Sequence, residues 1–111
     1  MSAVNYESNP HEILLANEGD IHLASRCLKA MAHPLRLKIL CVLAKGEQTS
    51  VQDLVDLLGT SQSNISQHLS LLKQKGILTC EKDANKSFYR ISDNKIINLM
   101  ESMRIAFCIT D

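Results

Sequence analysis

Two short apolar segments, each opened by a serine and closed by a glycine, lie in tandem in the middle of the chain. The first occupies residues 50–59 and the second residues 61–76. Serine is a favoured helix N-cap because its hydroxyl accepts a backbone hydrogen bond, and glycine ends many helices in the left-handed conformation. Asp53 follows Ser50 at the spacing of a capping box. The pattern therefore predicts two helices joined by a tight turn at Gly59.

Apolar residues at helical spacing extend this pattern in both directions. Pro34 opens a preceding helix, Gly46 ends it, and Ser92 is expected to cap a last helix. The expected elements are helices at residues 11–31 (irregular near Gly19), 34–45, 50–58 and 61–75, strands at 77–80 and 87–91 around a turn at 83–86, and a helix at 92–108. The sequence predicts a mainly α fold with a small β-hairpin, in the order α-α-α-α-β-β-α, which is a winged helix-turn-helix.

The length of 111 residues suits one domain. We expect a flexible N-terminal segment at residues 1–10 and a folded domain at residues 11–111. The N-terminus is polar and acidic without the apolar core of a signal peptide, and no apolar run is long enough to cross a membrane. The chain is therefore expected to be cytoplasmic.

The formal net charge is zero, which by itself argues weakly against a nucleic-acid partner. The charges are unevenly distributed, however. Residues 1–20 contain four acids and no Lys or Arg, residues 21–46 contain five bases and no acid, and residues 61–90 contain five bases and two acids. A local basic surface is therefore compatible with the neutral total.

The helix expected at residues 61–75 has an unusual polar face. Ile65, Leu69 and Leu72 form its apolar side, whereas residues 61–72 contain neither Lys nor Glu, the residues that dominate ordinary solvated helix faces. Gln and Asn pair bidentately with adenine, Ser bonds several bases or a phosphate, and free N–H groups at a helix start hold phosphates. An ordinary solvated face is the alternative. The candidate DNA-binding residues of this helix are Ser61, Gln62, Ser63, Asn64, Ser66, Gln67 and His68.

Lys82 and Lys86, beside the expected hairpin turn, are candidates for contacts to an adjacent phosphate, with a solvated turn as the alternative.

Four segments resemble parts of the ArsR/SmtB family of repressors. Residues 32–40 (AHPLRLKIL) resemble its opening motif, residues 60–69 (TSQSNISQHL) its recognition-helix signature, and residues 76–78 and 88–91 its wing strands. The resemblance covers residues 12–108. It implies a homodimer built from the first and last helices, which binds an inverted repeat in double-stranded operator DNA and releases it with an inducer. It also implies that His68 lies close to DNA, whereas a packing role at the edge of the core is the alternative.

Both metal sites of that family lack their ligands here. One uses cysteines at the start of the helix before the recognition helix, where residues 50–54 read Ser-Val-Gln-Asp-Leu. The other uses an Asp-x-His and a later His pair, of which Asp93 is present but Lys95, Ala106 and Ile109 fill the remaining places. His11 and His22 are about 16 Å apart along a helix, too far to share one zinc ion. We therefore expect no metal ligand set and no cofactor.

The four cysteines are widely spaced and are expected to be reduced in a cytosolic chain. Each cysteine, considered by itself, is compatible with a small buried apolar side chain that serves only in packing. Cys41 and Cys108, however, resemble the positions of the family's dithiol branch, the persulfide-responsive repressors. That resemblance implies that one thiolate attacks oxidised sulfur and the other captures it as a disulfide or polysulfide bridge within one subunit. Cys80 is expected to face inward, and Cys27 to lie on the dimer helix.

Three functions follow from these features. The first is a repressor released from its operator by reactive sulfur species or an oxidant acting at Cys41 and Cys108. The second is a repressor that responds to a soft metal or arsenite through cysteine ligands. The third is an interaction module that uses the same fold without DNA. An enzyme is not expected, because no Ser-His-Asp spacing, glycine-rich phosphate loop or paired carboxylates are present.

Overall fold

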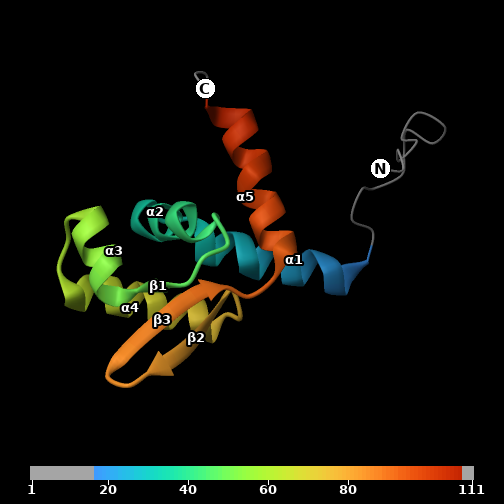
Figure 1. Cartoon of the computed structure of the whole chain (residues 1–111). Helices are drawn as coiled ribbons and strands as arrows, with labels where there is room; N and C mark the ends of the chain where they lie inside the picture. The colour runs from blue at the N-terminus through green and yellow to red at the C-terminus, as the bar shows by residue number, and fades with distance from the viewer. Residues whose placement is uncertain (1–16, 109–111) are drawn as a thin grey trace.

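The computed structural model describes residues 17–108. The expected flexible segment at residues 1–10, the predicted helix start at His11, and Ile109 lie outside the described residues. The elements are α1 (Glu18–Met31), α2 (Pro34–Leu43), β1 (Thr49–Ser50), α3 (Val51–Leu58), α4 (Gln62–Gln74), β2 (Leu78–Asp83), β3 (Lys86–Ile91) and α5 (Asn94–Phe107). The predicted winged helix-turn-helix order is confirmed, with one additional strand, β1 (Figure 1).

The predicted caps fix the helix-turn-helix. The Ser50 hydroxyl accepts a hydrogen bond from the Asp53 N–H at 3.1 Å, and the Ser61 hydroxyl accepts one from the Asn64 N–H at 3.1 Å. Gly59 lies between the two helices with φ of 67°, a left-handed conformation that costs glycine little. These local contacts explain why the boundaries of α3 and α4 were predictable from the sequence.

The predicted cap of the last helix was wrong by one residue. The Asp93 carboxylate accepts a hydrogen bond from the Lys95 N–H, so Asp93 is the N-cap of α5. The Ser92 hydroxyl instead lies 2.6 Å and 3.0 Å from the carbonyl oxygens of Gly76 and Ile77, where it closes the base of the hairpin. Both residue types cap helices well, and a contact distant in sequence selects between them.

The sheet is three-stranded and antiparallel, in the order β1-β3-β2. Strand β1 pairs Thr49 with Tyr89 and Ser50 with Phe88, so the start of α3 is joined to the wing. The wing is longer than expected, because β2 and β3 continue to Asp83 and Lys86. Cys80 shares a strand face with Leu78 but is only half-buried, because the core ends beneath Leu78.

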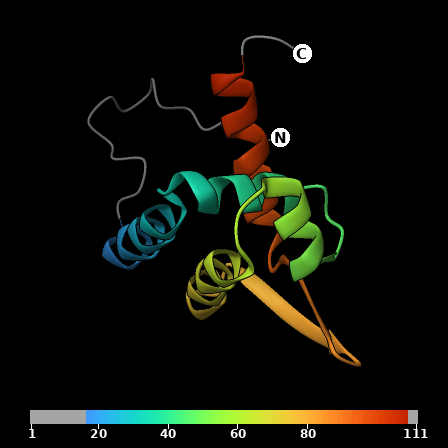
Figure 2. The same cartoon turned by 90° about the vertical axis from the view of Figure 1, so that its left-hand side faces the viewer.

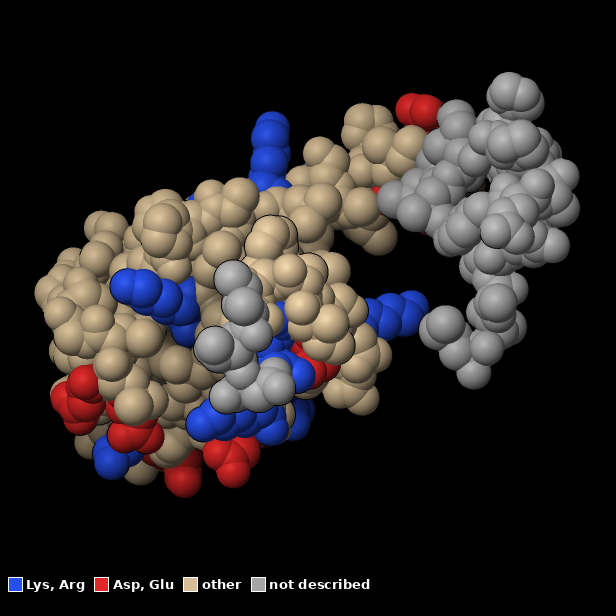
Figure 3. Space-filling model, turned by 90° about the horizontal axis from the view of Figure 1, so that it is seen from above, with Lys and Arg blue, Asp and Glu red and all other residues tan. Residues whose placement is uncertain are grey.

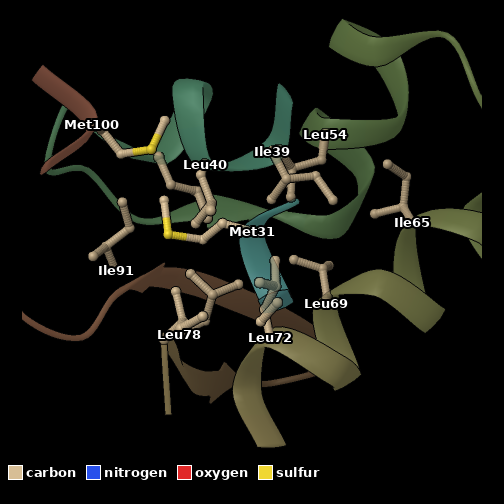
Figure 4. Packing of buried hydrophobic residues seen from close by; sticks show 13 residues of the cluster. Met31, Ile39, Leu40, Leu54, Ile65, Leu69, Leu72, Leu78, Ile91 and Met100 are labelled. Carbon is tan, nitrogen blue, oxygen red and sulfur yellow. The ribbon is translucent and has the colours of Figure 1, made fainter. Parts of the chain in front are cut away.

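The core lies between α2, α3, α4 and the base of the hairpin (Figure 4). Its fully buried side chains include three from each of α2 and α4: Ile39, Leu40, Leu43, Ile65, Leu69 and Leu72. By contrast, α5 rises away from this body with its C-terminal end projecting (Figures 1 and 2). Among the described helices, none combines the length and apolar content that crossing a membrane requires.

Truncating a core leucine of α2 should destabilise the fold far more than truncating a surface leucine. Leu40 is fully buried, so Leu40→Ala is expected to lower the free energy of unfolding by about 2–5 kcal/mol. Leu57 is 65% exposed, so Leu57→Ala should change it by no more than about 0.5 kcal/mol. Urea unfolding at one fixed protein concentration measures both, and equal losses would contradict the packing described here.

Candidate nucleic-acid interface

Helix α4 presents one buried face and one polar exposed face. Ile65, Leu69 and Leu72 are 0% exposed and hold the helix against the core. On the outer side, the exposed residues are Ser61, Gln62, Ser63, Gln67, Ser70 and Gln74, and Ser66 is half-buried beside them. Because the buried face is fixed by packing, the orientation of this polar face is fixed as well. We call Ser63, Gln67 and Ser70 the polar stripe.

Two predicted DNA-binding residues of α4 are already bonded within the protein. The Asn64 side-chain amide donates a hydrogen bond of 3.0 Å to the Thr60 hydroxyl. The Nδ1 atom of His68 lies 3.1 Å from the guanidinium Nη1 of Arg36, and its ring packs on that of His33 with centroids 4.5 Å apart. Burial lowers the pKa of His68, and the nearby His33 and Arg36 lower it further. This environment favours the packing alternative for His68.

The wing reaches the same side of the molecule as the starts of α3 and α4. A hollow of about 190 Å³ lies between them, lined by Ser50, Val51, Gln52, Gln62, Asn85, Lys86 and Ser87. Lys86 thus lies beside two helix N-termini, whereas Lys82 is exposed on β2. Gln52 and Ser87 were not predicted from the sequence, since only the pairing of β1 with β3 brings these segments together.

The cysteines fall into an exposed pair and a half-buried pair. Cys41 on α2 and Cys108 at the end of α5 are exposed free thiols, and no disulfide joins them. Helix α5 rises away from the body of the molecule (Figures 1 and 2). Cys27 is half-buried, with its sulfur 3.7 Å from that of Met31, and burial raises the pKa of its thiol. Cys80 lies opposite Tyr89 in the sheet.

Within residues 17–108, no three His, Cys, Asp or Glu side chains lie close enough to hold one metal ion.

Outside the helix-turn-helix formed by α3 and α4, the large exposed apolar side chains lie on helices α1 and α5. Leu23 and Leu28 of α1 are 65% and 52% exposed, and Ile105 and Phe107 of α5 are 68% and 80% exposed. A hollow of about 520 Å³ between the two helices has an apolar floor that includes Leu23, Ala24, Cys27, Ile77, Ile96 and Leu99. Uncharged side chains predominate on the surface seen from the C-terminal end of α5 (Figure 3).

Comparisons with known proteins agree with this geometry. Residues 33–79 match the family described as bacterial regulatory protein, arsR family. The biofilm growth-associated repressor of Agrobacterium fabrum is 40% identical over 81 residues, which cover 73% of this chain and 68% of that protein.

Two solved structures share the fold. Reduced HlyU from Vibrio cholerae superimposes with a TM-score of 0.76 at 36% identity, covering 82% of this chain and 95% of that one. The repressor BigR from Xylella fastidiosa superimposes with a TM-score of 0.78 at 29% identity, covering 84% and 94%.

The relatives are DNA-binding transcriptional regulators rather than enzymes, as the sequence analysis predicted. The matched residues 33–79 include the whole helix-turn-helix and the start of the wing. With these relatives and this fold, the chain belongs to the arsR family of bacterial transcriptional regulators.

Proposed function

We propose that this regulator is a homodimeric repressor that reads an inverted repeat in operator DNA with α4 and is released by thiol oxidation at Cys41 and Cys108. The observation that carries the DNA-binding part is the polar stripe of α4, held outward by a fully buried opposite face. A major-groove helix needs such short hydrogen-bonding side chains near its N-terminal half.

The surroundings of α4 suit a DNA backbone. The N–H groups at the start of α4 and the hollow beside Lys86 offer donors and a positive charge at the edge of the reading face. Ser61, Gln62 and Lys86 therefore contact phosphates in this proposal, while Ser63 and Gln67 face base edges. Lys82 is exposed further along the wing and adds charge there.

The second copy covers the apolar faces of α1 and α5. Leu28, Ile105 and Phe107 are more than half exposed in the single chain, and burying such side chains is worth about 1.5–3 kcal/mol each. A two-fold dimer built on these helices presents two copies of α4. Its half-sites should then lie about one or two DNA turns apart.

The inducer step uses the two exposed thiols, which are accessible to a soluble sulfur donor. The Cys41 thiolate attacks the outer sulfur of a persulfide, RSSH, to form a Cys41 persulfide and release RS⁻. The Cys108 thiolate then displaces HS⁻ and forms the disulfide. Two thiols lose two electrons in total, and RSSH is reduced to RSH and H₂S. The structure of one relative, HlyU from Vibrio cholerae, is described as that of the reduced protein.

The C-terminal end of α5 projects from the body of the molecule (Figure 1), and in this proposal α5 shifts toward α2 when the bridge forms. Disulfide geometry needs Cα atoms within about 7 Å, whereas a bridge with extra sulfur atoms tolerates a longer gap. Weakening operator binding 100-fold requires about 2.8 kcal/mol of differential stability between the two dimer arrangements. Closing the loop between Cys41 and Cys108 supplies a constraint of about 4 kcal/mol. Only the part of this free energy that differs between the two dimer arrangements weakens DNA binding.

Base discrimination is the first test of this proposal. Gln67→Ala should lose about 1–3 kcal/mol of discrimination if Gln67 pairs bidentately with a base. Binding is measured by fluorescence anisotropy on a duplex that the protein selects from a random inverted-repeat pool, and on a scrambled duplex, across a salt series. The matched control Gln48→Ala removes an amide that contacts Glu81 and should discriminate as the unmodified protein does. Equal binding of the unmodified protein to both duplexes would refute the DNA-reading proposal.

The cysteines are tested with the same duplex and a polysulfide reagent. Cys41→Ser and Cys108→Ser should each bind DNA when reduced and fail to release it with polysulfide, because neither can complete the bridge. Cys27→Ser and Cys80→Ser are the matched controls and should still release, with the Cys41–Cys108 bridge detected by mass spectrometry. Full release by Cys108→Ser would disprove the dithiol mechanism.

Zinc at equimolar concentration should leave operator affinity unchanged, since the family's two ligand sets are missing from this sequence. A soft-metal or arsenite site with three cysteine ligands would need more than one subunit, because no three possible ligands lie together within residues 17–108. Titration calorimetry measures the binding of zinc and of arsenite, and the anisotropy assay then measures operator affinity in the presence of each. Stoichiometric binding coupled to DNA release would make the metal-sensing alternative correct.

A further inference from the structure

We propose that Arg36 and His68 form a positioning contact that ties the recognition helix to the dimer helix, and that this contact holds only while His68 is neutral. Operator binding, on which this inference rests, should therefore weaken as the medium becomes acidic.

One arginine side chain joins three helices. From α2, the Arg36 Nε–H donates to the carbonyl oxygen of Ala30 in the last turn of α1 at 2.5 Å. Its Nη1 lies 3.1 Å from Nδ1 of His68 on α4. Ala30 is 4% exposed, so the end of α1 is anchored in the core. A planar guanidinium with several donors in fixed directions suits such a double contact.

The donor and acceptor roles in this contact are fixed. A guanidinium has only donors, so Nδ1 of His68 must accept, and the ring proton is on Nε2. Nδ1 of His33 also accepts, because the Leu35 N–H donates to it at 3.1 Å as the cap of α2. The centroids of the two rings lie 4.5 Å apart, so the two acceptor imidazoles are neighbours where α2 meets α4. A proton on Nδ1 of His68 removes the acceptor that Arg36 needs.

The charges around His68 oppose its protonation. From the N-terminal end of α2, His33 and Arg36 lie beside the ring, and burial and their charges lower the pKa of His68. On α4 itself, residues 61–72 carry no acid or base apart from His68. No ion pair with a carboxylate involves His33, Arg36 or His68 in the part of the chain that the structure describes. Burial is the largest cause that lowers the pKa of His68, with His33 and Arg36 adding to it.

The contact lies where the proposed dimer and the reading face meet. Helix α1 carries the exposed apolar side chains that we assign to the second copy, and α4 carries the polar stripe. A rotation of α1 in the dimer displaces the Ala30 carbonyl, and Arg36 transmits the displacement to His68. Arg36 is thus a positioning residue for α4 and does not itself contact bases.

The direction of the pH effect distinguishes the Arg36–His68 contact from a simple attraction between a protonated His68 and DNA phosphates. If the DNA-bound form excludes the proton from His68, then protons and DNA compete, and acid weakens binding. The ordinary histidine pKa is 6.5 and that of His68 is lowered, so the loss develops below pH 6.5. A histidine that only lay near phosphates would gain positive charge in acid and tighten binding.

Anisotropy with the selected duplex at about pH 7.5 and about pH 5.5, at constant ionic strength, tests the inference with the full reduced chain. The unmodified protein should bind about fivefold more weakly at the lower pH. His68→Asn keeps an acceptor for Arg36 but cannot titrate, so its ratio of dissociation constants should approach one. His22→Asn changes an exposed histidine of α1 and should keep the ratio of the unmodified protein.

A second variant reports on the contact without DNA. Arg36→Gln removes the positive charge and cannot donate to Ala30 and His68 as the guanidinium does, so the His68 titration midpoint, followed by ¹⁵N NMR of the imidazole, should rise toward the ordinary value. Operator affinity at about pH 7.5 should fall about tenfold while the dimer persists in sedimentation.

Three results would each overturn the inference. They are an operator affinity that stays constant or rises in acid, a His68→Asn variant with the same pH dependence as the unmodified protein, and a His68 titration midpoint that does not move in Arg36→Gln. Failure of the unmodified protein to prefer the selected duplex at either pH would instead refute the proposed function, and the NMR midpoint would still decide the contact.

Discussion

Burial of one face of α4 is the constraint on which the rest of the structure depends. Ile65, Leu69 and Leu72 are completely enclosed by α2, α3 and the base of the hairpin. Removing three such side chains from water is worth about 1.5–3 kcal/mol each, far more than any single surface contact. The orientation of the polar stripe follows from this packing, so the helix needs no charged residue of its own to define its outward face.

The sequence predicted what local chemistry determines. Ser50, Gly59 and Ser61 act within one turn of their own positions, so the boundaries of α3 and α4 could be read directly. The cap of α5 could not, because Ser92 bonds the carbonyls of Gly76 and Ile77, about 15 residues earlier. Strand β1 escaped prediction for the same reason, since two residues carry no periodicity and their partners come much later.

The same difference between local and distant contacts decides which parts of the candidate site could be predicted. The polar composition of α4 was visible in the sequence, but the side on which His68 lies depends on Arg36, 32 positions away. The relation between Cys41 and Cys108 is still further from local control. Their positions were interpreted through a family resemblance, and the single chain leaves α5 projecting with an exposed apolar end. In the proposed dimer a second copy covers that end, so contacts between two subunits rather than local sequence determine the surroundings of Cys108.

Helix α2 connects the two proposed control points. Arg36 lies in its first turn, beside α1 and α4, and Cys41 lies near its other end. Between them, Ile39 and Leu40 are locked in the core, so the helix cannot bend locally without opening a cavity. A covalent pull on Cys41 would therefore move α2 as a rigid rod rather than distort one turn. The Arg36 end of that rod reaches His68, which makes the orientation of α4 the point where a thiol bridge and a proton would both act.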